Sequence, residues 1–131
     1  MAIHEHAFRS TPVGLLSQAR SSLVEAEVAA DAGERFRLAH LSALRTAAAI
    51  CADRGRPTAA RRRLLSVWVL LERVAPEHTH WATYFAAGAQ LRAAIEAGAV
   101  SAVSMRAADD QVRAAAEFLA VVGESLGLLA A

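Results

Sequence analysis

The sequence predicts an all-α protein folded as a five-helix up-and-down bundle. Two features of the composition favour helices: 33 of the 131 residues are Ala, and only seven Gly and three Pro interrupt the chain. Alanine is the strongest helix former and is uncommon in strands. The third observation is the placement of Gly and Pro, which divide the chain into five helical segments with short links. Short links predict that consecutive helices pack antiparallel.

The first predicted helix covers residues 12–31, because Thr11 is a suitable N-cap and Gly33 follows as a stop signal. The second predicted helix covers residues 34–54 and ends at Gly55. When each segment is projected at about 100° per residue, its apolar side chains gather in one stripe. Each of these helices should therefore bury one face.

The third predicted helix covers residues 59–75, with Thr58 as its N-cap and Pro76 as its stop signal. Its apolar residues, which include Trp68, point nearly all round the helix. A helix with this pattern lies at the centre of a fold or in an interface between copies.

Pro76 can also open the fourth predicted helix, residues 77–97, which ends at Gly98. Ser104 caps the fifth predicted helix, residues 105–126. Many core-facing positions are Ala or Gly, so the helices can approach closely but bury little area. We expect a homodimer, because a second copy would add buried area.

The length suits one domain, which we place at residues 11–131, after a mobile N-terminus at residues 1–10. A hydrophobic content of 55% with a net charge of +1 excludes a disordered chain. Cys51 is the only cysteine, which excludes a disulfide scaffold, and its place on a core stripe predicts an inert thiol. We expect a cytoplasmic protein with no membrane contact, because no secretory signal is seen and the apolar run at residues 64–71 is short.

Three side chains are candidates for catalysis: His40, Arg37 and Arg92. His40 projects into the apolar stripe of the second helix, where a polar ring needs a hydrogen-bond partner. It is either a satisfied core histidine or a base or ligand in a cleft, with Arg37 one turn away. Arg92 lies on the aromatic flank of the fourth helix. It either binds a carboxylate or phosphate through its planar fork or forms a structural ion pair.

Five arginines fall within ten residues around the start of the third predicted helix. Cations in a first helical turn oppose the helix dipole, and an anion at the Thr58 cap would relieve that cost. The anion-binding or nucleic-acid-binding candidates are therefore Arg54, Arg56, Thr58, Arg61, Arg62 and Arg63. We expect the anion to be the phosphate of a nucleotide, RNA or DNA. The alternative is a solvated basic loop.

The other polar residues predict neither a metal site nor a cofactor. His78 and His80 point about 200° apart on a helix, so they cannot share a metal on one face. The sequence contains no glycine-rich phosphate loop and no nucleophile motif. On the fifth helix, Asp109, Asp110 and Arg113 should form solvated ion pairs at i,i+4 and i,i+3 spacing.

Three sequence patterns follow one another along the chain. GERFRLAHLSALRTAAAI occupies residues 33–50, and the last helix opens with SMRAAD at residues 104–109. Between them, the fourth helix carries an "APE...WA.YFAAGA" pattern, matched by Ala75, Pro76, Glu77, Trp81, Ala82, Tyr84, Phe85, Ala86, Ala87, Gly88 and Ala89. This order resembles the HEPN superfamily of helical domains, and in particular a small actinobacterial HEPN family. The resemblance spans roughly residues 12–128.

The resemblance implies a bundle that dimerises. Many HEPN domains are ribonucleases of toxin–antitoxin or defence systems, with an Arg-x4–6-His motif late in the fold that is paired across the dimer. Arg92 stands at about the place of that arginine, but positions 97–99 are Ala, Gly and Ala. Arg35 and His40 have the required spacing, but they lie in the second helix and project about 140° apart. The resemblance therefore implies a HEPN-like domain without the ribonuclease motif.

Three functions are compatible with these observations. The first is a non-catalytic, homodimeric binding module that presents residues 54–63 and Arg92 to nucleic-acid or nucleotide phosphate. The second is a metal-independent ribonuclease that uses His40 with Arg37 or Arg92. The third is a purely structural partner of another protein, with the apolar third helix as the interface.

Overall fold

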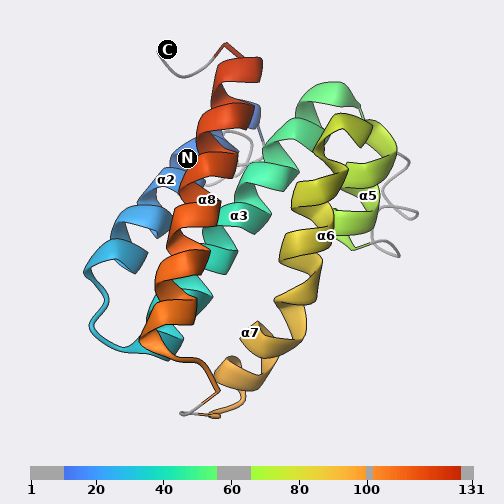
Figure 1. Cartoon of the computed structure of the whole chain (residues 1–131). Helices are drawn as coiled ribbons and strands as arrows, with labels where there is room; N and C mark the ends of the chain where they lie inside the picture. Colours follow the sequence, from blue (N-terminus) through green and yellow to red (C-terminus); the bar gives the residue numbers. More distant parts are fainter. Residues whose placement is uncertain (1–10, 56–65, 100–101, 128–131) are drawn as a thin grey trace, which may run out of the picture.

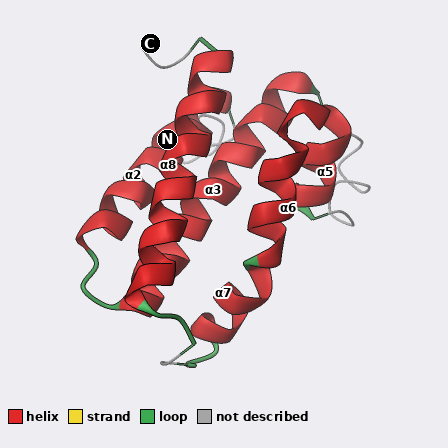
Figure 2. Cartoon of the chain, viewed as in Figure 1, coloured by secondary structure: helices red, strands yellow, loops and turns green. Residues whose placement is uncertain are grey.

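The computed structural model describes residues 11–55, 66–99 and 102–127, which form an all-α bundle without any strand in those ranges (Figures 1 and 2). The elements are α2 (Pro12–Val28), α3 (Ala32–Arg54), α5 (Val67–Val74), the 3-10 helix η1 (Pro76–His78), α6 (Thr79–Ala87), α7 (Ala89–Glu96) and α8 (Met105–Ser125). The predicted fold class is confirmed. Residues 1–10, predicted to be a mobile N-terminus, lie outside the described residues.

α2 and α3 run antiparallel, as predicted, but the boundary between them differs from the prediction (Figure 1). The Thr11 hydroxyl caps α2 by accepting a backbone N–H at 3.0 Å, and α2 then ends at Val28. Asp31 caps α3, because its carboxylate accepts a backbone N–H at 2.8 Å. The prediction of a helix up to residue 31 was wrong, since it took Gly33 as a stop signal. Gly33 lies in the first turn of α3, and Asp31 is the start signal.

The third predicted helix is shorter than expected. α5 begins at Val67 after Ser66, whose backbone is extended and whose hydroxyl accepts the N–H of Val69 at 3.2 Å. One continuous helix over residues 59–75 was therefore wrong, because extended backbone at Ser66 interrupts it. Thr58, the predicted cap, lies outside the described residues.

The fourth predicted helix is divided into three pieces. Pro76 opens η1, α6 follows directly, and α7 leaves the direction of α6 at Gly88 (Figure 1). A continuous helix over residues 77–97 was therefore wrong. The fifth predicted helix is confirmed: the Ser104 hydroxyl caps α8 at 3.1 Å, and Gly127 follows its end with a φ of 69°.

α3 is the central helix of the bundle. Twelve of its 23 residues are buried, and it packs against α2, α5, α7 and α8. The third predicted helix was expected at the centre or in an interface between copies. α3 holds the central position and α5 packs on α3 and α6, so the interface alternative stays a prediction. Trp68, Leu70 and Leu71 of α5 are buried, whereas Val69 is 41% exposed.

Small side chains make the core thin, in line with the composition. Among the described residues, ten of the 23 buried hydrophobic side chains are Ala. Aromatic rings supply bulk beside α6, where Trp68, Trp81, Phe85 and Phe118 pack with centroid distances of 5.4 to 5.9 Å. Within the described ranges, each helix is too short or too polar to cross a membrane.

Candidate functional site

His40 lies in the middle of α3, where its side chain is completely buried. Its ring stacks on Phe36 with a centroid distance of 6.2 Å and meets the edges of Trp68 and Phe85 at 5.8 and 6.3 Å. The predicted position of His40 within the apolar stripe of this helix is therefore correct. A ring enclosed in this way must find its polar partners inside the protein.

Both ring nitrogens of His40 have a partner. Nε2 lies 2.8 Å from the carbonyl oxygen of Phe85, and Nδ1 lies 3.2 Å from Nη1 of Arg92. A carbonyl oxygen only accepts hydrogen bonds and a guanidinium only donates them. Nε2 of His40 therefore carries the proton, and Nδ1 carries the lone pair that accepts from Arg92. Burial lowers the pKa of His40, and the nearby Arg92 charge lowers it further, against the raising effect of the Phe85 carbonyl. His40 is therefore held as a neutral imidazole of one defined tautomer.

The break at Gly88 makes room for this arrangement. The N–H of Gly88 turns back to the Phe85 carbonyl at 3.0 Å, so that carbonyl serves both Gly88 and His40. A Cβ atom at Gly88 would lie only 3.3 Å from His40 Cδ2 and 3.3 Å from Phe36 Cζ. Glycine therefore lets the junction of α6 and α7 lie directly against the His40 ring.

Arg92 reaches His40 from α7 and is only partly covered, with a side chain that is 23% exposed. Nη1 donates to His40, whereas Nε is buried and has no hydrogen-bond partner. The nearest carboxylate, Oε2 of Glu96, lies 3.8 Å from Nε, which is too far for a hydrogen bond. Sequence reasoning missed Glu96, although its i,i+4 spacing from Arg92 was a readable signal.

Arg37 lies on another face of α3 and does not bond to His40. Its Nε and Nη2 atoms each donate to the Glu34 carboxylate at 2.9 Å. These bonds to Glu34 raise the pKa of Arg37, and the charges of Glu96 and Glu25 raise it further. The structure therefore joins His40 to Arg92 directly, whereas Arg37 bonds to Glu34.

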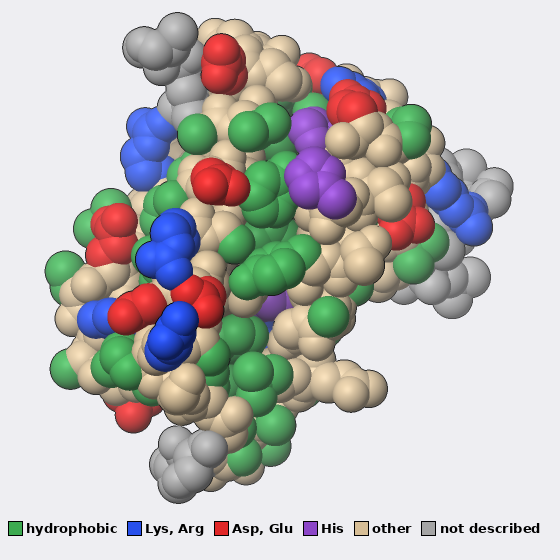
Figure 3. Space-filling view, in the orientation of Figure 1, with side chains coloured by type: hydrophobic (Ala, Val, Ile, Leu, Met, Phe, Trp, Pro, Cys, Tyr) green, Lys and Arg blue, Asp and Glu red, His purple; other side chains and the backbone are tan. Residues whose placement is uncertain are grey.

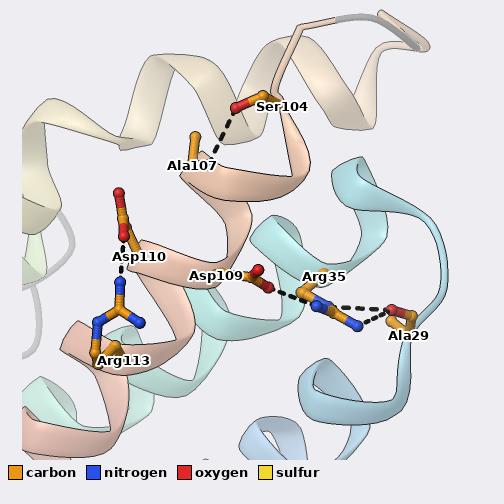
Figure 4. A network of polar contacts seen from close by, with 7 residues as sticks. All are labelled: Ala29, Arg35, Ser104, Ala107, Asp109, Asp110 and Arg113. Carbon is orange, nitrogen blue, oxygen red and sulfur yellow. Dashed lines mark hydrogen bonds and ion pairs between the residues drawn. The ribbon is translucent and has the colours of Figure 1, made fainter.

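Arg35 points away from His40, as the projection predicted. Its Nε and Nη2 donate to the carbonyl of Ala29 at 3.1 and 2.8 Å, and Nη1 pairs with Asp109 of α8 (Figure 4). The predicted pairing of Asp109 with Arg113 was wrong, because Asp109 turns to Arg35. Only the Asp110–Arg113 pair forms within α8. A surface pocket of about 420 Å³ adjoins this network and is lined by Glu27, Arg35, Asp109, Val112, Arg113 and Ala116.

The predicted anion site is described only at its first residue. Arg54, in the last turn of α3, forms an ion pair with Glu77 of η1. The other candidates, Arg56, Thr58, Arg61, Arg62 and Arg63, lie outside the described residues. Glu77 was not expected as a partner of this segment, and the fold brings it there by turning η1 back toward the end of α3.

The remaining titratable groups make no cluster suited to a metal ion within the described ranges. His78 is 5% exposed, and its Nε2 lacks a hydrogen bond and lies 4.0 Å from Oε2 of Glu77. Burial lowers the pKa of His78. Burial also raises the pKa of Cys51 to about 11, which agrees with the inert thiol predicted for it.

The face of the molecule shown in Figure 3 carries an apolar band. Hydrophobic side chains gather between α8 and α6 in this view, and charged side chains flank the band on the α8 side. Tyr84 of α6 is 44% exposed, and burial together with the charge of Asp110 raises its pKa.

Comparison with known proteins gives one family. The model of the SAV_6107-like HEPN family matches residues 26–123, which run from the end of α2 to near the end of α8. No curated protein and no solved structure matches the chain. The family match covers most of the sequence and agrees with the resemblance seen in the second and fourth predicted helices. The chain therefore belongs to the HEPN superfamily, as a member of the SAV_6107-like HEPN family.

Proposed function

We propose that this HEPN domain is a non-catalytic binding module that contacts the phosphate groups of RNA, DNA or nucleotides. The observation that carries the proposal is the state of His40. The ring is fully buried, and both of its nitrogens already have partners inside the protein. No histidine occupies positions 97–99, where the motif of the ribonucleases would place one after Arg92.

General acid–base cleavage of RNA needs a group that can reach the substrate and exchange a proton near neutral pH. A guanidinium only donates hydrogen bonds, so Arg92 can stabilise negative charge but cannot serve as the base. His40 could exchange a proton, but its Nδ1 lone pair is occupied by Arg92 and its ring has no exposed surface. His40 can therefore hold the Arg92 guanidinium in place, but the two residues together offer no accessible group that could carry a proton.

Two groups of arginines support phosphate binding. Arg92 presents a partly covered guanidinium, and residues 54–63 hold five of the 14 arginines. The net charge of the chain is only +1, so the high density of positive charge in residues 54–63 is a local feature. Locally clustered arginines suit the regular spacing of phosphates along a nucleic-acid backbone. A homodimer and a cytoplasmic location belong to the same proposal and stay predictions.

The test is binding of a fluorescent 20-nucleotide single-stranded RNA, measured by anisotropy at about 50 mM and about 200 mM salt. We expect wild-type protein to bind at low salt and to weaken by on the order of tenfold or more at the higher salt. Reversing Arg61, Arg62 and Arg63 to Glu should abolish binding. The matched control reverses three exposed arginines elsewhere, Arg20, Arg73 and Arg106, and should retain most of it. Wild-type protein that does not bind at low salt would rule out the nucleic-acid function.

The second candidate function is a metal-independent ribonuclease, and the 3.2 Å contact between His40 and Arg92 is the observation in its favour. The same RNA, followed on a denaturing gel, separates the two. We expect no cleavage by wild-type protein. Cleavage that disappears in both His40→Gln and Arg92→Gln, with folding intact by circular dichroism, would instead establish the enzyme.

A further inference from the structure

Arg92 has one edge that is engaged and one that is not. Nη1 is fixed by the His40 lone pair at 3.2 Å, and His40 is itself fixed by the Phe85 carbonyl at 2.8 Å. The side edge of a guanidinium, formed by Nε and the second terminal nitrogen, is the edge that grips an oxyanion with two parallel hydrogen bonds. Here Nε is buried without a hydrogen-bond partner, so this edge lacks the acceptor that it is built for.

Glu96 stands where that acceptor belongs. Its carboxylate lies 3.8 Å from Nε of Arg92, close enough for charge attraction and too far for a hydrogen bond. Arg37 does not compete for it, because its own Nε and Nη2 are bonded to Glu34. Arg92 therefore faces a carboxylate that it attracts without forming a hydrogen bond.

The position of Glu96 makes it easy to displace. It is the last residue of α7, where the negative end of the helix dipole disfavours a carboxylate. Its side chain is 48% exposed, so it can turn into solvent without moving α7. The attraction of Arg92 offsets the unfavourable dipole, and a stronger acceptor bound to Arg92 would remove that attraction.

We infer that Arg92 forms an oxyanion site closed by Glu96, and that an incoming phosphate group displaces the Glu96 carboxylate. His40 is the positioning residue of this site, because it holds Nη1 and leaves the side edge of Arg92 toward Glu96. The Glu96 carboxylate competes with incoming anions for Arg92. An anion that binds weakly does not displace it, whereas a backbone phosphate of a nucleic acid that is also bound elsewhere on the protein does. That the phosphate comes from a nucleic acid rests on the proposed function. The anion-binding site at Arg92 does not depend on it.

The decisive variant is Glu96→Gln, which keeps the shape of the side chain and removes its charge. Glu124→Gln is the matched control, because Glu124 is also an exposed glutamate in the last turn of a helix. Glu96→Gln should tighten binding of the 20-nucleotide RNA about two- to fivefold, as expected for losing a half-exposed competing charge. Glu124→Gln changes the net charge equally and should have a smaller effect. Equal effects of the two substitutions would overturn the inference.

A second measurement tests the site without nucleic acid. The Nε–Hε signal of Arg92, assigned in a ¹⁵N NMR spectrum by its absence in Arg92→Gln, should move on titration with inorganic phosphate. It should move at lower phosphate concentration in Glu96→Gln than in wild-type or Glu124→Gln protein. A signal that ignores phosphate in all three proteins overturns the site. If phosphate moves the signal and RNA neither binds nor moves it, the site stands and the nucleic-acid function falls.

Discussion

At His40 the two ring nitrogens have opposite roles, and this determines which residues can act together. Nε2 donates to a backbone carbonyl, and Nδ1 accepts from Arg92, which is 52 residues away in sequence. Arg35, which has the motif spacing to His40 in the sequence, instead bonds to Ala29 and Asp109. Spacing along a helix does not reveal which arginine meets a buried ring, because the partner comes from a different helix.

This arrangement predicts a pH dependence of stability. The pKa of His40 is lowered from its ordinary value of 6.5, mainly by burial, so the unfolded chain binds a proton that the folded chain resists. The free energy of unfolding should therefore be highest above pH 6.5 and should fall as the pH drops below that value. Protonation would also set an N–H of Nδ1 against the Arg92 guanidinium. Urea denaturation at about pH 7 and about pH 5 measures the loss.

His78 contributes in the same direction, because burial lowers its pKa too, so a variant is needed to separate the two. His40→Phe keeps a ring of similar size and removes the titration. It should cost about 1–3 kcal/mol at neutral pH through the lost hydrogen bonds, and its pH dependence should be shallower than that of wild-type protein. An identical pH dependence in His40→Phe would contradict the assignment.

At the level of the helices, Gly88 decides where the α6–α7 segment bends. Its backbone lies in the right-handed helical region, with φ of −84°, so alanine meets no backbone strain there. Helix propensity alone predicts that Gly88→Ala stabilises the protein by about 1 kcal/mol. The added Cβ, however, would sit 3.3 Å from both His40 and Phe36, which are buried and cannot move aside. We expect overpacking to win, with a net loss of about 1–2 kcal/mol in urea denaturation.

Whether Gly88→Ala lowers or raises the free energy of unfolding distinguishes overpacking from helix propensity. A stabilised Gly88→Ala protein would show that α7 moves away from α3 at little cost. Ala87→Gly, one residue earlier at an exposed position, reports propensity without the steric contact and should cost about 1 kcal/mol.

These helices also show how far the sequence could lead. Alanine content and Gly or Pro stop signals were enough to predict an all-α bundle and the limits of α8, because these signals are local. The break at Gly88 was not predictable, since glycine inside a helix is tolerated and the reason for the break is the His40 ring of another helix. The start of α3 was missed for a local reason, because Asp31 and Gly33 gave competing signals. At the site, His40 and Arg92 were each identified, but their contact depends on how α3 and α7 pack.

At the scale of the whole molecule, one side chain joins three elements at the end of the bundle where α8 begins. Arg35 of α3 donates twice to Ala29, just past the end of α2, and once to Asp109 near the start of α8 (Figure 4). The Arg35 side chain is 21% exposed, whereas Asp109 is 48% exposed, so solvent weakens the ionic part of the contact. The two hydrogen bonds to the Ala29 carbonyl therefore contribute more to the stabilising effect of Arg35 than the ion pair with Asp109.

Arg35→Ala should destabilise the protein by about 1–2 kcal/mol in urea denaturation, because it removes three hydrogen bonds that connect separate elements. Arg37→Ala is the matched control: it removes an arginine from the same helix that bonds only to Glu34 on its own surface, and it should cost less than about 0.5 kcal/mol. Arg35→Lys keeps the charge but lacks the planar fork that serves Ala29 and Asp109 together, so it should recover less than half of the loss. Equal costs for Arg35→Ala and Arg37→Ala would mean that α8 is held at this end by the packing of its apolar face against α3 alone. Amide exchange in the first turns of α8 measures this directly, since it should quicken in Arg35→Ala and stay unchanged in Arg37→Ala.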